Sequence, residues 1–244
     1  MRYFIELSYD GTAYHGWQIQ PNGESVQGTL QKALKTLLRE EVPVTGAGRT
    51  DAGVHAAMMV AHVDIPTAVP VPAQQLVYRL NGILPHDIAI HRIYPVADDR
   101  HARFSALART YYYYVHTRKS PFLRDRSWRL VRTPDFEAMN RAAATLLEYE
   151  DFTSFSKVNT DTKTHICHVR SARWVQLSDY EWRFEITADR FLRNMVRAIV
   201  GTLMEVGRGQ LTIDGFRKVI EDKNRSAAGD SVPAHGLFLQ NVEY

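Results

Sequence analysis

The order of amphipathic segments repeats once along this chain, and that order restricts the fold more than any other feature of the sequence. In the first half, period-two alternation predicts strands and a three-to-four-residue leucine spacing predicts a helix. The predicted elements are strands at 2–9, 42–48, 55–64 and 88–95, with helices that begin at Ser25 and at Pro72. Ser25 is a favoured N-cap residue, and Asn81-Gly82 is a typical helix end.

The second half repeats the same order with one extra helix. Thr133-Pro134-Asp135 predicts a helix start, because it offers a cap, a proline for the first turn and an early acid. Ser178-Asp179 predicts the turn of a hairpin. The predicted elements are strands at 109–117, 165–177, 180–188 and in the terminal GLFLQNVEY, with further helices at about 190–206 and 212–222.

Each half therefore reads as β-α-β-β-α-β, the ferredoxin-like arrangement of an α+β protein. We expect the halves, 1–105 and 106–244, to join edge to edge into one extended, mainly antiparallel sheet. Helices would cover one face of that sheet and leave a groove over the other. With 244 residues, of which 45% are hydrophobic, the chain has ample material for such a core.

Two features of the composition indicate a cytoplasmic protein with no membrane segment. No apolar run approaches the roughly 20 residues that cross a bilayer, and the alternating N-terminus lacks the apolar stretch of a signal peptide. Cys167 is the one cysteine, so no internal disulfide can form, which fits a reducing compartment.

Positive charge is concentrated in one segment of a chain whose net charge is only +3. Residues 100–132 contain nine Lys or Arg against a single acid, Asp125. On charge alone, a solvated basic loop and a binding face for a polyanion are equally good interpretations. Aromatic residues within the segment, such as Phe104, Tyr111 and Trp128, favour single-stranded or looped nucleic acid, since bases stack on rings while cations hold phosphates.

The loop Gly46–Ala56 is the most specific stretch of the sequence. It lies between two predicted strands, and its three glycines allow tight turns and close approach to a ligand. An ordinary turn with a turn-favouring aspartate is the plain alternative. Because Arg49, Asp51 and His55 stand among small residues, we favour a pocket with Asp51 as its acidic group.

Several segments, in order, resemble those of the tRNA pseudouridine synthase family that modifies uridines 38, 39 and 40 of the anticodon arm. They are GAGRTDAGVHA at 46–56, YDGTAYHGWQ at 9–18, ARFSALARTYYYY at 102–114, FLRNMVRAIVGTLMEVG at 191–207 and PAHGLFLQNVEY at the end. The resemblance implies an isomerase that flips a uridine out of folded tRNA and works as a homodimer. The reaction imports and oxidises nothing, so no cofactor and no metal are expected.

The resemblance also assigns roles to individual residues. Asp51 is implied to be the catalytic carboxylate, Arg49 to help displace the target base, and Tyr111 to be the pocket tyrosine of an R-x-Y-x-Y strand. Arg197 is implied to be the basic partner of Asp51. Among Arg190, Arg193 and Arg197, which a continuous helix would place on one face, solvent exposure is the plain alternative.

Three further residues complete the predicted substrate site. Arg109 precedes Tyr111 on the same strand face, His55 lies in the aspartate loop, and Leu237 is a candidate apolar wall beneath the base. A plain core role for Leu237 is nearly as good an interpretation. Tyr112 departs from the family pattern, because a basic residue is common at that position.

Other interpretations are weaker. His165, Cys167 and His168 do not share a strand face, and no second cluster exists to complete a zinc site, so a structural role is expected. A non-catalytic RNA-binding protein with the same platforms would not need an aspartate in a glycine loop. A glycoside hydrolase usually needs two carboxylates, and only Asp51 is convincing.

Overall fold

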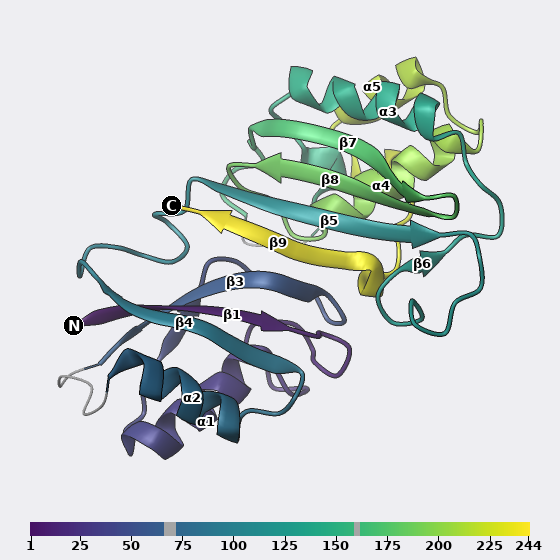
Figure 1. The fold of residues 1–244 in the computed structure, drawn as a ribbon. Helices are drawn as coiled ribbons and strands as arrows, with labels where there is room; N and C mark the ends of the chain where they lie inside the picture. Colours follow the sequence, from purple (N-terminus) through teal and green to yellow (C-terminus); the bar gives the residue numbers. More distant parts are fainter. Residues whose placement is uncertain (66–71, 159–161) are drawn as a thin grey trace. The chain divides into compact units, whose positions relative to one another are not determined.

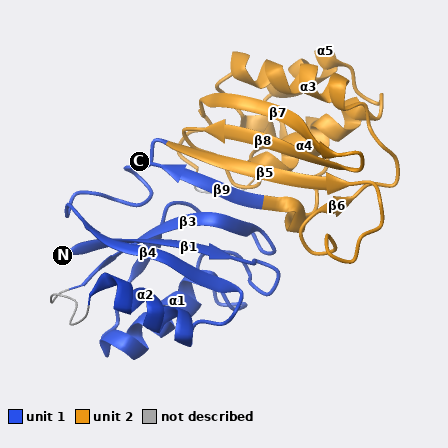
Figure 2. Cartoon of the chain, viewed as in Figure 1, with its two compact units in different colours: residues 1–107, 238–244 blue, residues 108–237 orange. Residues whose placement is uncertain are grey.

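The computed structural model describes residues 1–65, 72–158 and 162–244. These residues form two compact units (Figure 2). Unit 1 comprises Met1–Leu107 together with Phe238–Tyr244, and unit 2 comprises Ala108–Leu237. The final strand, which the sequence analysis placed in the second half, therefore belongs to unit 1.

Unit 1 contains the element order β-α-β-β-α-β, followed by the chain's last strand (Figure 1). Its elements are β1 (Arg2–Tyr9), α1 (Val26–Leu38), β2 (Val44–Gly46), β3 (His55–Asp64), α2 (Ala73–Ile83), β4 (Ile88–Val96) and β9 (Leu237–Glu243). The strands β4, β1, β3 and β9 are neighbours in that order, and β2 pairs with β3. All these pairings are antiparallel except that of β3 with β9, in which His55 lies opposite Phe238.

Local chemistry explains where these elements begin and end. Ser25 caps α1 as predicted, since its Oγ accepts the Gly28 N–H at 3.1 Å. Leu30 and Leu34 of α1 are fully buried. Helix α2 continues through Asn81-Gly82 to Ile83, beyond its predicted end. The Asn81 amide explains the difference, because it bonds both backbone groups of Ile90 on β4 and holds the last turn of α2 against that strand.

Unit 2 is built on a long hairpin with helices packed against it. Its elements are β5 (Ala108–His116), β6 (Trp128–Arg129), α3 (Phe136–Ala144), β7 (Val169–Ser178), β8 (Glu181–Ala188), α4 (Met195–Gly207) and α5 (Ile213–Glu221), with short 3₁₀ turns at Thr145–Glu148, Thr153–Phe155, Arg225–Ala227 and Ala234–Gly236. Strand β8 lies between β5 and β7 and is antiparallel to both. Helix α3 packs on β7, and α4 and α5 pack on α3.

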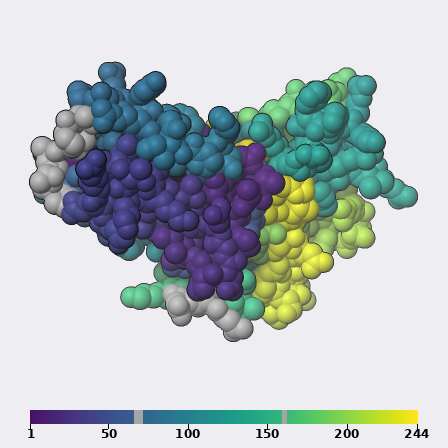
Figure 3. Space-filling view, turned by 90° about the horizontal axis from the view of Figure 1, so that it is seen from below, coloured from purple at the N-terminus to yellow at the C-terminus, as the bar shows by residue number. Residues whose placement is uncertain are grey.

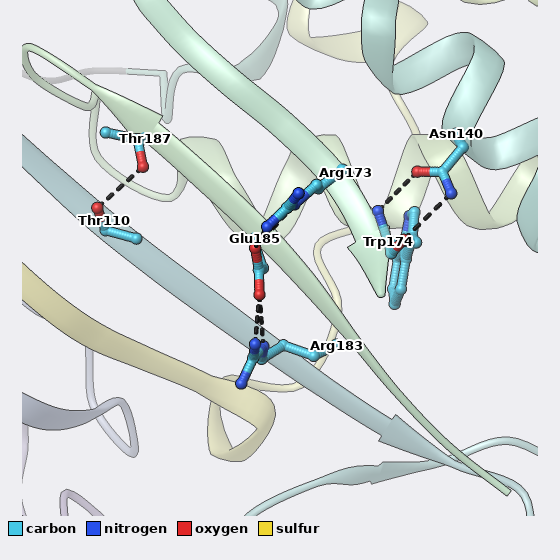
Figure 4. A network of polar contacts seen from close by, with 7 residues as sticks. All are labelled: Thr110, Asn140, Arg173, Trp174, Arg183, Glu185 and Thr187. Atoms are coloured by element: carbon cyan, nitrogen blue, oxygen red, sulfur yellow. Dashed lines mark hydrogen bonds and ion pairs between the residues drawn. The ribbon is translucent and has the colours of Figure 1, made fainter. Parts of the chain in front are cut away.

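One face of the unit 2 strands carries a polar network (Figure 4). Glu185 on β8 accepts hydrogen bonds from Arg173 on β7 and from Arg183, each at 2.9 Å. The Arg183 guanidinium lies 4.1 Å from the ring centre of Tyr112. Tyr112 therefore makes a cross-strand contact with an arginine. The tyrosine that is fully buried is its neighbour Tyr113.

Three element starts in unit 2 differ from the prediction. Helix α3 begins at Phe136, with Asp135 rather than Thr133 as its cap. Strand β7 begins at Val169, because residues before it pair instead with residues 150–152. Helix α4 begins at Met195 rather than near 190, because Asn194 adopts a left-handed backbone with φ of 67°. As a result, Arg190 and Arg193 lie outside the helix, and no arginine stripe forms.

A buried histidine in unit 1 makes stability depend on pH. His62 on β3 is 6% exposed, and its Nδ1 accepts the Ala102 N–H at 3.1 Å. The pKa of His62 is lowered from 6.5 to about 4. Burial is the main cause, and the nearby Arg2 and His101 add to it. The unfolded chain therefore binds a proton between these values that the folded chain does not. Stability from this group is present above pH 6.5 and is lost as the pH falls towards 4.

We expect His62→Asn to flatten this dependence, because the Asn Oδ1 can accept the same N–H and does not titrate. In the parent, the free energy of unfolding at pH 4.5 should lie on the order of 2 kcal/mol below its value at pH 7 through this residue. Urea titrations of both proteins at pH 4.5, 5.5, 6.5 and 7.5 measure the effect. Equal slopes in parent and variant would contradict it.

Candidate active site

The aspartate loop connects β2 to β3 within unit 1. Asp51 is half-buried, Arg49 before it is exposed, and Thr50 between them is buried. The backbone turns back after Asp51, whose carbonyl accepts the Val54 N–H at 3.1 Å. The loop therefore presents a carboxylate and a guanidinium from a backbone that is itself tied down.

A second segment, residues 9–17, packs against the backbone of this loop and is hydrogen-bonded to it. The backbone N–H of Trp17 donates to the Thr50 carbonyl at 3.3 Å, and the backbone N–H of Gly53 donates to the Tyr14 carbonyl at 3.2 Å. The hydroxyl groups of Tyr9 and Thr50 lie 2.8 Å apart in a buried hydrogen bond. These bonds fix the backbone on both sides of Asp51.

Gly16 makes the closest approach between the two segments. It adopts φ of 90°, and a Cβ at this position would lie 2.3 Å from the Thr50 carbonyl oxygen and 3.1 Å from the Asp51 carbonyl carbon. Only glycine satisfies both the positive φ and this spacing. The backbone on either side of Asp51 is thus packed directly against Gly16.

The segment after β1 also packs against the start of the aspartate loop. Trp17 is 3% exposed and packs over Gly46, where an added Cβ would meet the indole at 2.5 Å. Trp17 therefore braces the start of the loop at Gly46. The outer residues that follow are exposed, and purple atoms from the N-terminal part of the chain are seen at the surface in Figure 3.

His55 lies at the end of the loop and is only 2% exposed. Its Nδ1 accepts the Gly11 N–H at 3.1 Å and lies 3.2 Å from an Asp10 carboxylate oxygen. The ring stacks on Phe238 of β9 with centroids 4.4 Å apart. The structure therefore places His55 among the supports of the loop, and its predicted contact with substrate stays a prediction.

In unit 2, the predicted residues of β5 lie next to the segment that precedes α4. Arg109 donates to the Asp189 carbonyl at 2.7 Å. Tyr111 is buried and meets the Phe191 ring edge to face, with centroids 5.1 Å apart. The loop that replaces the first turns of the expected helix thus contacts two of the predicted site residues.

Arg197 is held at the first turn of α4. Its Nε donates to the Val232 carbonyl at 2.7 Å, and its own carbonyl accepts the Val232 N–H at 3.3 Å. Tyr113 fixes the next residue, since its hydroxyl donates to the Pro233 carbonyl at 2.9 Å. Leu237, four residues further on, is buried. The predicted pair of Asp51 with Arg197 joins residues of different units and stays a prediction.

No group of three or more metal-binding side chains exists among the described residues, 1–65, 72–158 and 162–244. Cys167 is fully buried, and burial raises the pKa of its thiol to about 12, which disfavours a thiolate ligand. Its N–H donates to the Glu150 carbonyl. The burial of Cys167 agrees with the structural role expected for this residue.

Tyr9, Gly16 and Trp17 are the supporting residues that the sequence analysis did not assign. The signal that could have found Gly16 is its place between His15 and Trp17, where a glycine interrupts bulky residues. Nothing in the spacing indicated that Tyr9 and Thr50 would meet, because 41 residues separate them.

Comparisons with known proteins address the whole chain. A family model described as tRNA pseudouridine synthase matches residues 7–105 and 142–244. A Bacteroides thetaiotaomicron protein named tRNA pseudouridine synthase A is 60% identical over 245 residues, covering 100% of this chain and 90% of that protein. The Bacteroides fragilis protein of the same name is 58% identical, with 100% and 96% covered. A Bacillus subtilis protein, also of that name, is 40% identical, with 100% and 99% covered. In the described part of the chain, no helix is long and apolar enough to span a membrane.

Proposed function

The chain belongs to the tRNA pseudouridine synthase family, and on that premise we propose that it isomerises uridines 38, 39 and 40 of the tRNA anticodon arm with Asp51 as its catalytic residue. The protein is an isomerase that acts on tRNA. The observation that carries the residue assignment is the Asp51 loop, which is tied from behind by residues 9–17 while Asp51 itself stays half-buried.

The reaction needs one carboxylate and exact placement of its substrate. The N1–C1′ bond breaks, the uracil turns, and C5 bonds to C1′, while the C5 proton leaves and N1 gains a proton. Asp51 supplies the negative group, either as a nucleophile towards sugar or base or as the base that takes the C5 proton. The detached base must stay in place while it turns, which a pre-tied loop favours.

The other predicted residues have complementary roles in this proposal. Arg197, with Nε fixed to the Val232 carbonyl, pairs with Asp51 and orients it. Tyr111 stacks on the flipped uracil, which offsets part of the cost of removing a base from its stack. Arg49 and Arg109 contact the RNA, Leu237 lies beneath the base, and His55 contacts or positions the substrate through the loop.

The larger arrangement is part of the same proposal. Two ferredoxin-like halves, 1–105 and 106–244, form one sheet with the catalytic groove on the face away from the helices, and the end of the second half, Phe238–Tyr244, packs with the first. The element order of unit 1 supports the first half. The resemblance to the family supports a cytoplasmic homodimer that binds the anticodon arm without a cofactor.

A tritium-release assay tests the proposed sites. The parent protein should release tritium from tRNA transcripts labelled with [5-³H]uridine, because C5 loses its hydrogen when it bonds to C1′. Transcripts in which positions 38, 39 and 40 are all cytidine should give at least about tenfold less release and still bind. A non-catalytic RNA-binding protein would bind both transcripts and release tritium from neither. Equal release from both transcripts would contradict the assignment of positions.

A further inference from the structure

The turn after β4 displays an aromatic side chain that the proposed mechanism does not use. Phe104 is 77% exposed, although it lies in a segment whose backbone is well tied. The guanidinium of Arg103, also exposed, lies 5.5 Å from the centre of the Phe104 ring. The His101 ring packs beside the same ring at 4.4 Å between centroids. A large apolar ring is therefore presented to solvent together with a cation.

Two histidines hold the backbone of this turn. His101 Nδ1 accepts the N–H groups of Arg103 and Phe104, at 3.0 and 3.2 Å. Ser105 closes the turn, since its Oγ accepts the His101 N–H at 2.9 Å. Burial lowers the pKa of His101 as it does that of His62, which keeps both rings neutral and able to accept.

Ala102, between His101 and Arg103, anchors the turn in unit 1. Ala102 is fully buried; its N–H donates to His62 and its carbonyl accepts the Tyr244 hydroxyl at 2.6 Å. Because Ala102 is fixed inward, Arg103 and Phe104 are held outward without an ordering cost at the moment of binding. Single exposed apolar residues are common. Here the backbone N–H groups of Phe104 and of Arg103 before it are both held by His101.

We propose that Arg103 and Phe104 form a stacking platform for an unpaired base of the tRNA substrate. An exposed ring beside a guanidinium suits the face of a nucleobase, and stacking of this kind tolerates any base. Asp98 and Asp99 precede the turn, so its local charge is balanced and a base is favoured over a phosphate as the contact. The platform rests on the proposed function, since it needs a tRNA substrate, and it acts in binding rather than in the isomerisation.

The test compares Phe104→Ala and Phe104→Trp with Tyr78→Ala. Tyr78 lies on α2 of the same unit and is 81% exposed, so it controls for loss of any surface aromatic. We expect Phe104→Ala to raise the KM for tRNA and the Kd of an anticodon-arm RNA roughly tenfold, with kcat within about twofold of the parent. Phe104→Trp should retain parental values, and so should Tyr78→Ala.

The possible outcomes separate this proposal from the proposed function. No tritium release by the parent would remove the proposed function, while the Kd measurement would still test the platform. Parental KM and Kd in Phe104→Ala would overturn the platform alone. A change of the sedimentation coefficient in Phe104→Ala without RNA would assign the ring to contact with a second copy of the chain, and would also overturn it.

Discussion

An Asp51→Asn protein should bind tRNA with parental affinity and release tritium at least about a thousandfold more slowly than the parent. The substitution keeps the size and shape of the side chain and removes its charge. The supports of the loop lie in its backbone and in the Tyr9–Thr50 hydrogen bond, so they are retained. Single-turnover assays with excess enzyme measure the chemical step separately from binding.

Thermal unfolding is the control for correct folding of the variant, and its midpoint should change by only a few degrees. Titration with labelled anticodon-arm RNA is the control for RNA binding by the variant. Undiminished release by the Asp51→Asn protein would remove this carboxylate from the mechanism and leave the loop without an assigned role.

The second large effect is expected for Gly16→Ala. The new methyl group would lie 2.3 Å from the Thr50 carbonyl oxygen, and the residue already holds φ of 90°. Backbone strain and the clash together should cost about 2–4 kcal/mol in the free energy of unfolding. Because the displaced backbone carries Asp51, kcat should fall by about 100-fold even under conditions in which the variant is fully folded.

Gly48→Ala is the matched control for that variant. Gly48 lies in the same loop, yet no atom lies within 4 Å of a Cβ placed there. Its urea unfolding curve should match that of the parent to within about 1 kcal/mol. If Gly16→Ala turned over at the parental rate, the close packing behind Asp51 would have no bearing on catalysis.

Local patterns predicted most of the elements, and their failures have specific causes. Alternation located β1, β3, β4 and β8, and Ser25 was identified as a cap from its residue type. The start of α4 was missed because the left-handed backbone of Asn194 leaves no trace in a hydrophobic pattern. The parallel pairing of β9 with β3 could not be read either, because it joins residues more than 180 positions apart.

In the candidate site too, local sequence features predicted some residues and missed others. The residue types and glycines of the loop at 46–56 predicted a pocket with Asp51 as its acidic group, and the resemblance added a role for Arg49; both stay predictions. The supports from Tyr9, Gly16 and Trp17 depend on tertiary contacts, and only coordinates reveal them. The burial of His55 among the supports of the loop was likewise not readable from its small neighbours, and its substrate contact stays a prediction.

The strand that pairs with His55 has a consequence for biosynthesis. Phe238, which stacks on His55, leaves the ribosome only after the whole of 108–237 has been made. Until translation reaches the last strand, the first 107 residues therefore lack the strand that pairs with His55 and Ala56, and His55 lacks its stacking partner. The Asp51 loop would thus reach its final form late, and nascent chains would acquire activity only after this last segment has emerged.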